Sequence, residues 1–307
     1  MIISASYKTD IPAFYGSWFR ARRATGHCEV QNPWNRKNFT VSLRDADCSG
    51  FVFWTRNARP FGPELARTAR THPFLVQYTL TGLPRWLERS VISVEDAISD
   101  ISRISTQYGR DSVVWRYDPI VTSNTTPPDW HLTNFRQIAD DLSGTVDEVV
   151  VSFAQIYRKT RRNLEQAAHK HEAEWRDPDR NEKGDLLAQL HTIAADRGLT
   201  LTTCTQPELA GGPAEPARCI DADRLNRVAT HLGHAAITAR SKGQRPGCLC
   251  AEARDIGAYN SCAHGCVYCY AVEDAAAARH AHRGHDAAAP NLTPVTMGHA
   301  PKKALNS

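Results

Sequence analysis

Six short segments of the chain are rich in β-branched and aromatic residues, and most of them are separated by stretches with helical periodicity. Several segments, such as 51–54 and 149–151, are almost continuously apolar. Strands that are buried on both faces of a parallel sheet have this pattern. The sequence therefore predicts six buried strands, at residues 2–6, 50–55, 74–80, 112–117, 148–153 and 199–204.

Three stretches between these strands have apolar residues at helical spacing, begin at a polar capping residue and end near a glycine. They are residues 93–109, 129–144 and 185–198. Each leads directly into a strand, and alternating β and α elements imply right-handed parallel crossovers. We expect an α/β fold, a partial (βα)6 TIM-like barrel. The pattern leaves a doubly wound sheet open as the alternative.

The chain divides into three expected regions. Residues 1–204 would form the partial βα barrel, with the highly charged stretch 158–183 as an exposed helix and loop. Residues 205–274 would form a cysteine-rich segment that closes the barrel mouth. Beyond about Asp274 the chain turns to Ala, His, Pro and Gly, which predicts a flexible tail at 275–307.

Composition limits the partners and the compartment. Of the 307 residues, 41% are hydrophobic, which is typical of a chain that folds around a core. The net charge of +4 is too balanced to indicate a nucleic-acid partner, and no apolar run approaches the roughly 20 residues that span a bilayer. The N-terminus lacks the pattern of a signal peptide, so we expect a cytoplasmic protein. Clustered cysteines there more often bind metals or act in redox chemistry than form disulfides, which stay open as the alternative.

Three of the nine cysteines form the strongest chemical motif. Cys262, Cys266 and Cys269 have C-x3-C-x2-C spacing, with Tyr268 just before the last cysteine. A tight loop with this spacing can direct three thiolates to one iron–sulfur cube, and three protein ligands leave one of four irons open to a small molecule. A zinc site is the alternative, in which Cys248 and Cys250 would supply the missing ligands.

This motif resembles the signature of the radical S-adenosylmethionine (radical SAM) superfamily. The resemblance implies that the open iron binds the amino and carboxylate groups of SAM, and that Tyr268 lies beside the adenine. One electron, from a reductant such as flavodoxin or ferredoxin, would cleave SAM into methionine and a 5′-deoxyadenosyl radical that abstracts hydrogen from the substrate. In most members the motif follows the first strand. Here it follows the sixth βα unit, which resembles a circular permutation or a C-terminal loop folded over the barrel mouth.

The chain up to about Asp274 also resembles a bacterial family of unassigned function, the domain of unknown function 1848 family. Its hallmarks occur here at residues 4–6, 9–12, 53–55 and 115–119 and in the C-terminal cysteine block. The Cys-Tyr-Ala ending is similar to that of spore photoproduct lyase, a radical SAM enzyme that acts on thymine dimers.

A second set of cysteines occupies the same half of the chain: Cys204, Cys219, Cys248 and Cys250. Cys204 ends the sixth strand, at the edge where parallel α/β folds place their sites. We expect the four to ligate an auxiliary [4Fe-4S] cluster. The alternative is that Cys204 and Cys219 are small buried residues, a common fate of free cysteine. Cys28 and Cys48 lack partners and are expected to be structural.

Polar residues gather at the carboxyl ends of the predicted strands, where ligand chemistry is usual. From these we expect catalytic roles for Lys8, Asp10, Arg116 and Asp118, and cofactor contacts for Arg56 and Gln77 in addition to Tyr268. Cations there could hold carboxylates or phosphates. An internal network of salt bridges that caps the barrel is the alternative for each residue.

The expected function is that of a radical SAM enzyme acting on a small substrate, with nucleoside-like molecules among the candidates. The auxiliary cluster could donate sulfur, as in lipoyl and biotin synthases, two members of the superfamily. A nucleic-acid repair or modification enzyme is one alternative, although the near-neutral charge counts against a DNA footprint. A zinc-stapled binding module without chemistry is the other.

Overall fold

The computed structural model describes residues 1–33, 35–206, 209, 212–243 and 247–292. Its main feature is a sheet of eight strands in the order β11-β10-β8-β6-β5-β4-β1-β12, with every neighbouring pair parallel. All six predicted strands are confirmed. The strands are β1 (Ile2–Ala5), β4 (Gly50–Thr55), β5 (Phe74–Thr79), β6 (Val113–Ile120), β8 (Glu148–Phe153), β10 (Thr200–Thr203), β11 (Glu215–Pro216) and β12 (Ala253–Asp255).

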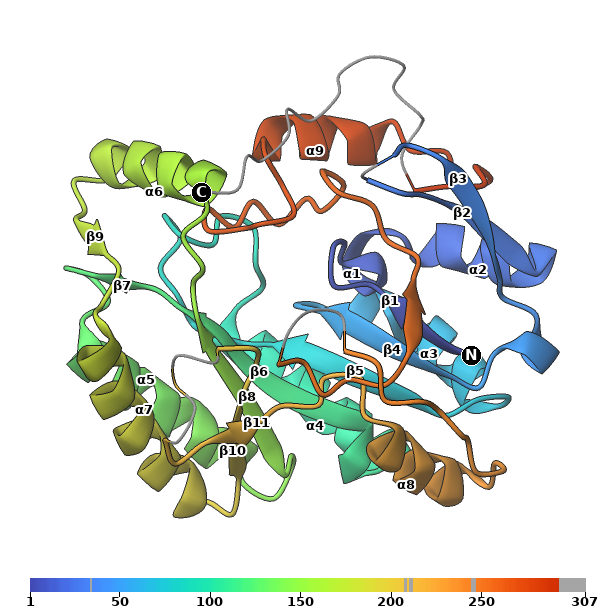
Figure 1. Cartoon of the computed structure of the whole chain (residues 1–307), viewed down its shortest axis with the longest axis horizontal. Coiled ribbons are helices and arrows are strands. Elements are labelled where there is room, and N and C mark those ends of the chain that lie inside the picture. The colour runs from blue at the N-terminus through green and yellow to red at the C-terminus, as the bar shows by residue number, and fades with distance from the viewer. Residues whose placement is uncertain (34, 207–208, 210–211, 244–246, 293–307) are drawn as a thin grey trace.

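From β1 to β11 the strands follow one another across the sheet in chain order, and β12 returns to lie beside β1 (Figure 1). A doubly wound sheet reverses its order part-way, and here only β12 lies on the other side of β1. Among the described residues no pairing joins β11 to β12, so the sheet is open there and a closed TIM barrel is not formed. The structure is thus an α/β fold built on a parallel sheet and flanked by helices.

Nine helices of the described chain surround this sheet: α1 (Ile11–Phe14), α2 (Gly16–Thr25), α3 (Gly62–Ala69), α4 (Val94–Tyr108), α5 (Pro128–Leu142), α6 (Arg158–Lys170), α7 (Arg180–Ala195), α8 (Ala222–Leu232) and α9 (Ala275–Arg283). Ser93 caps α4 as predicted, accepting the Asp96 N–H at 3.1 Å. Helix α7 begins earlier than predicted because Asp179 and Glu182 form a capping box there.

Smaller elements complete the fold. Strands β2 (His27–Gln31) and β3 (Asn38–Ser42) form an antiparallel hairpin, and β7 (Thr122–Ser123) pairs with β9 (Trp175–Arg176). Short 3-10 helices occupy Asp45–Asp47, Arg59–Phe61 and Arg110–Ser112. No helix in the described part of the chain has the length and apolar character needed to cross a membrane.

The two faces of the sheet have different covers. One face packs large side chains such as Phe53, Tyr78 and Trp115 against helices α2, α3, α4, α5 and α7. The other face packs Val52, Leu75 and their neighbours against α8. Because side chains alternate along a strand, this α8 face continues toward the carboxyl ends of the strands. There its positions change from apolar to mostly polar: Ser4, Trp54, Gln77, Arg116 and Ser152.

The C-terminal region is more integrated than the sequence indicated. Segment 205–274, expected only to close the mouth, contributes α8 and the two outer strands β11 and β12. The expected flexible tail begins with a helix, α9, because Asp274 accepts the N–H groups of Ala276 and Ala277 and Ala278 is fully buried. Residues 293–307 of the expected tail lie outside the described residues.

Candidate active site with two sets of cysteines

The loop that carries Cys262, Cys266 and Cys269 lies between β12 and α9 and is fastened to the segment after β5. Ser90 N–H donates to the His264 carbonyl at 3.0 Å, and Val267 N–H donates to the Leu87 carbonyl at 2.9 Å. Gly265 adopts a φ of +74°, which confirms the tight turn expected there. The three cysteines are therefore held on a fixed loop.

The three thiols lie close enough together to influence one another's ionisation. Burial raises the pKa of Cys266 to about 12, although Arg56 opposes the shift. Burial, together with Asp10 and the other two thiols, raises the pKa of Cys262 well above its usual range. Burial also raises the pKa of Cys269, against backbone N–H groups and Lys159. These thiols are protonated near neutral pH, and a metal would bind them with release of protons.

A buried network lies against Cys266. Arg56 donates to Glu88 at 2.7 Å and to the Tyr268 hydroxyl at 2.5 Å, and the Tyr268 hydroxyl itself donates to Glu88. Glu88 also accepts from Thr81 at 2.7 Å. Burial alone would lower the pKa of Arg56, but Glu88, Tyr268 and Cys266 together outweigh it and the pKa is raised, so the guanidinium stays charged. Arg56 and Tyr268, both predicted to contact the cofactor, thus belong to one ion-pair network beside the first set.

Asp10 connects this loop to the sheet. Its carboxylate accepts from the Thr55 hydroxyl at 2.8 Å, from the backbone N–H groups of Arg56 and Ala13, and contacts His264 Nε2 at 2.7 Å. Both oxygens are engaged, and the side chain is buried. Asp10, predicted to be catalytic, is therefore placed to position the loop between Cys262 and Cys266.

Lys8 has a single carboxylate partner among the described residues, Asp255, at 3.2 Å. Asp255 ends β12 and also accepts from Ser4 at 3.0 Å, Ser6 at 2.9 Å and the Tyr7 N–H at 3.2 Å. The ion pair therefore joins the ends of β1 and β12. Lys8, another predicted catalytic residue, sits on the strand-end edge as expected.

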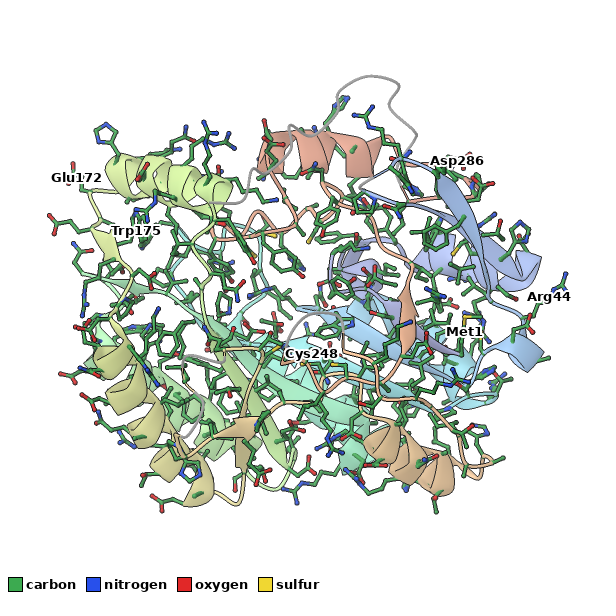
Figure 2. All side chains as sticks on the ribbon, in the orientation of Figure 1. Met1, Arg44, Glu172, Trp175, Cys248 and Asp286 are labelled. Atoms are coloured by element: carbon green, nitrogen blue, oxygen red, sulfur yellow. The ribbon has the colours of Figure 1, made fainter. Side chains whose placement is uncertain are left out.

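The second set of cysteines lies on the α8 face of the sheet. Cys204 and Cys219 are 3.6 Å apart between their sulfurs, and Cys250 accepts the Ile220 N–H at 3.4 Å. Cys248 packs into the same apolar cluster, over the middle of the sheet (Figure 2). All four cysteines of the predicted auxiliary site are thus brought to one region, from three separate segments of the chain.

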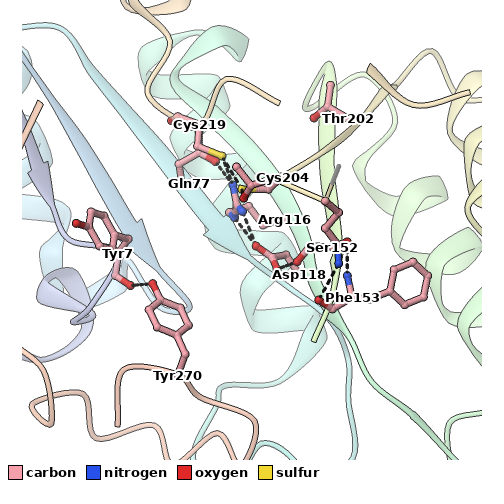
Figure 3. Close-up of polar contacts among 12 residues, drawn as sticks. Tyr7, Gln77, Arg116, Asp118, Ser152, Phe153, Thr202, Cys204, Cys219 and Tyr270 are labelled. Carbon is pink, nitrogen blue, oxygen red and sulfur yellow. Dashed lines mark hydrogen bonds and ion pairs between the residues drawn. The ribbon is translucent and has the colours of Figure 1, made fainter. Parts of the chain in front are cut away.

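Arg116 is the centre of this second region (Figure 3). Its guanidinium donates to Cys219 Sγ at 3.1 Å, to Gln77 at 3.0 Å and to Asp118 at 3.1 Å. Asp118 in turn accepts from Ser152. The pKa of Cys219 is raised to about 11: the hydrogen bond with Cys204 holds it down, Cys250 and burial raise it, and Arg116 opposes them. Gln77, predicted to contact the cofactor together with Arg56, lies here instead.

The sequence matches the model of a family described as a domain of unknown function, DUF1848, over residues 2–271. The chain belongs to this family. Among curated proteins, no sequence matches the DUF1848 chain.

Two solved structures share a distant likeness with the DUF1848 chain. A D-hydantoinase superposes with a TM-score of 0.32 and 8% identity, over 74% of this chain and 44% of its own. A candidate alpha-L-fucosidase from Bacteroides thetaiotaomicron VPI-5482 superposes with a TM-score of 0.26 and 10% identity, over 78% of this chain and 85% of its own. The chain thus spans less than half of the hydantoinase. Likenesses this weak carry no argument about function.

All nine cysteines of the DUF1848 chain are free thiols. Among the described residues, no three His, Cys, Asp or Glu side chains converge on one point as ligands of a single metal ion would. Cys28 and Cys48 are buried in the core, apart from both sets.

Three residues that hold the site together were not predicted: Glu88, His264 and Asp255. Each has a partner that is distant in the sequence: Tyr268 for Glu88, Asp10 for His264 and Lys8 for Asp255. Trp54 was also missed, but a signal for it existed. It alternates with Val52 along β4 and so faces the same way as Gln77 and Arg116.

Proposed function

We propose that the DUF1848 chain is a radical SAM enzyme, with one cluster on Cys262, Cys266 and Cys269 and an auxiliary cluster on the second set. The observation that carries the proposal is the loop of the first set. Its three cysteines have the spacing of the superfamily motif, and backbone hydrogen bonds fix their loop to residues 87–90. When bound, the cluster and SAM would supply hydrogen abstraction from the substrate.

The surrounding residues suit a negatively charged group. Thiolate-ligated clusters bring anionic ligands into a low-dielectric site, where an unpaired charge is costly. The Arg56 guanidinium lies beside Cys266, and the Arg116 guanidinium lies 3.1 Å from Cys219. Each set of cysteines therefore has one buried cation that would offset its charge. Asp10 and His264 would keep the first loop in place as the group binds.

Sulfur insertion is the reaction outcome we favour, because the second set supplies four cysteines on the same face as Arg116 and Gln77. An auxiliary cluster there would lie over the strand ends, where ligands of parallel sheets bind. An electron-transfer protein such as flavodoxin or ferredoxin would supply the electron. A single-turnover assay with isotopically labelled cluster sulfide tests this outcome, since product without labelled sulfur would contradict it.

Metal content tests the class of enzyme directly. Protein purified without oxygen should contain about eight irons and about eight labile sulfides per chain, and should convert SAM to 5′-deoxyadenosine when reduced. Replacing all three cysteines of the first set by alanine should remove about four irons and all SAM cleavage. Cys48→Ala, which removes a buried cysteine outside both sets, serves as the control. About one zinc and no iron would replace this proposal with a zinc-stapled module.

A further inference from the structure

An aromatic surface lies between the two sets of cysteines. Three of the six large hydrophobic side chains that the described chain exposes are tyrosines from this region: Tyr157, Tyr259 and Tyr270, with 49%, 39% and 43% of their surface exposed. They come from the start of α6 and from the cysteine segment. The Tyr270 hydroxyl donates to the Tyr7 carbonyl at 2.6 Å, which brings the end of β1 to the same surface (Figure 3).

Two lysines interleave with these rings. Lys8 Nζ lies 5.2 Å from the centre of the Tyr7 ring and 5.6 Å from that of Tyr259. Lys159 Nζ lies 5.9 Å from the centre of the same Tyr259 ring. All three distances are within the range of cation–π attraction. We call Tyr7, Lys8, Tyr157, Lys159, Tyr259 and Tyr270 the aromatic rim.

The charge of the rim is not fully compensated. Lys8 is paired with Asp255, whereas no carboxylate forms an ion pair with Lys159 in the part of the chain that the structure describes. The start of α6 adds the positive charges of Arg158, Arg161 and Arg162, and the first turn of this helix has no acidic residue. Burial raises the pKa of Cys269 and the Lys159 charge opposes that rise, so this lysine lies near the first set of cysteines.

The rim continues to the second set. The Tyr7 ring meets the Trp54 ring edge-on, with centroids 6.3 Å apart, and the Arg116 guanidinium lies 5.1 Å from the Trp54 ring. Arg116 in turn donates to Cys219. A continuous series of ring and cation contacts therefore runs from Lys159, beside Cys269, to Arg116, beside Cys219. A ligand on this surface would reach toward both proposed clusters.

Exposed aromatic rings alternating with cations suit a ligand that is both flat and anionic. Tyrosine faces stack against flat rings, and lysines attract phosphate. SAM does not account for the rim, because SAM carries a net positive charge that Lys8 and Lys159 would repel. An apolar ligand would leave the Lys159 charge without a partner.

We propose that the aromatic rim binds a nucleotide, with its base against the tyrosine rings and its phosphate at Lys159. The proposal rests on the proposed function in one respect: the nucleotide would be the substrate of that same site. A free nucleotide and a nucleotide within a single strand share this chemistry, and the experiment separates them.

The test is equilibrium dialysis of the full chain, purified without oxygen, against four nucleoside 5′-monophosphates, the matching nucleosides and a short single-stranded oligonucleotide of mixed sequence. At least one monophosphate should bind about tenfold more tightly than its nucleoside, because a charge-assisted contact is lost without the phosphate. Lys159→Gln should remove that difference. Lys170→Gln, at the other end of α6, should leave it unchanged.

The rings are tested separately. Tyr259→Ala should weaken monophosphate and nucleoside alike by about tenfold, and Tyr259→Phe should retain binding, because stacking needs the ring and not the hydroxyl. Tighter binding of the oligonucleotide than of any monophosphate would identify a nucleic-acid strand as the source. Equal affinity for monophosphate and nucleoside, no effect of Lys159→Gln, or no binding of any probe would overturn the proposal.

The two proposals fail differently. Binding is measured without SAM and without turnover, so a chain that lacks iron yet binds a nucleotide would end only the radical SAM proposal. A chain that contains iron and forms 5′-deoxyadenosine, but binds no nucleotide, would end only the inference about the rim.

Discussion

The two sets of cysteines are built in different ways. The first set comes from one short loop, so its spacing is visible in the sequence, and the fold only fastens that loop through residues 87–90 and Asp10. The second set comes from three separate segments, of which one carries both Cys248 and Cys250, and these segments meet on the α8 face of the sheet near Arg116. The difference teaches that a motif shows what a loop can bind, whereas a sheet can assemble a site that has no motif.

The largest expected effect separates the two sets by their roles. Cys266→Ala should abolish formation of 5′-deoxyadenosine, because the first set would hold the group that cleaves SAM. Cys219→Ala should leave that reaction measurable and stop only the later steps on substrate. The measurement is chromatography of 5′-deoxyadenosine after anaerobic reduction, with Cys48→Ala as the control. Equal loss in Cys266→Ala and Cys219→Ala would contradict the division.

The buried cations should differ in their importance for stability. Arg56→Met leaves Glu88, whose side chain is 3% exposed, without its cation and should lower the free energy of unfolding by about 3 to 5 kcal/mol. Arg116→Met should cost less, because the Asp118 side chain is 22% exposed and water can solvate it. Urea denaturation measures both. Adding Glu88→Gln to Arg56→Met should restore part of the loss, and a larger loss for Arg116→Met would reverse the comparison.

A smaller effect is expected where the first set's segment passes β1. A Cβ on Gly257 would lie 1.9 Å from Ser6 Oγ, so Gly257→Ala should lower the free energy of unfolding by about 1 to 3 kcal/mol. Gly184→Ala is the matched control, since nothing lies within 4 Å of a Cβ there. It sits inside α7 and should stabilise the protein by about 0.5 to 1 kcal/mol. Similar changes in both variants would show that the approach to Ser6 relaxes freely.

The smallest effect concerns α9, which packs beside the first set. His282 contacts the rings of Phe14 and Tyr15, and His285 contacts Tyr15. Burial lowers the pKa of both histidines. Their docked form therefore binds fewer protons than the free form, and docking is favoured above the unfolded histidine pKa of about 6.5 and is lost progressively as pH falls below it.

Hydrogen exchange of the α9 amides, corrected for the intrinsic rate, measures this change between about pH 7.5 and about pH 5.5. Protection should fall at the lower pH. Replacing His282 and His285 by phenylalanine should remove the dependence, whereas His169→Phe, on the exposed side of α6, should leave it. If the protection of α9 does not change with pH, protonation of these histidines does not weaken the docking of the helix.

Periodicity in the sequence predicts much of the sheet and part of the site. Apolar runs located the six strands, and their alternation also places Gln77, Arg116 and Trp54 on one face. The same alternation separates Gln77 from Arg56, which follows the end of β4 and turns toward Glu88. We predicted that Gln77 and Arg56 contact one cofactor because both lie at the ends of strands. Their side chains point to different regions, so strand-end position alone does not place them at one site.

What could not be predicted depends on contacts between loops. Glu88 lies in the connection after β5, and nothing in its own neighbourhood indicates that Arg56 and Tyr268 will reach it. His264 was visible inside the cysteine motif, but its use depends on Asp10, on the opposite end of the chain. The conformation of each loop depends on contacts with other loops that are distant in the sequence. The residue pattern of one segment does not indicate which distant segment will contact it.

The neighbour of β1 has a consequence for how the protein is made. β1 is synthesised before the other strands of the sheet, yet one of its two partners, β12, lies about 250 positions later. At about 5 to 20 residues per second, translation leaves that edge of β1 open for roughly 12 to 50 s. Asp255 is the last residue of β12, so its hydrogen bonds with Ser4 and Ser6 and its ion pair with Lys8 form only after β12 has been made. The loop of the first set follows β12 in the chain, so its thiols take their places only after the strands of the sheet have been made, and a cluster on them would be loaded after that point.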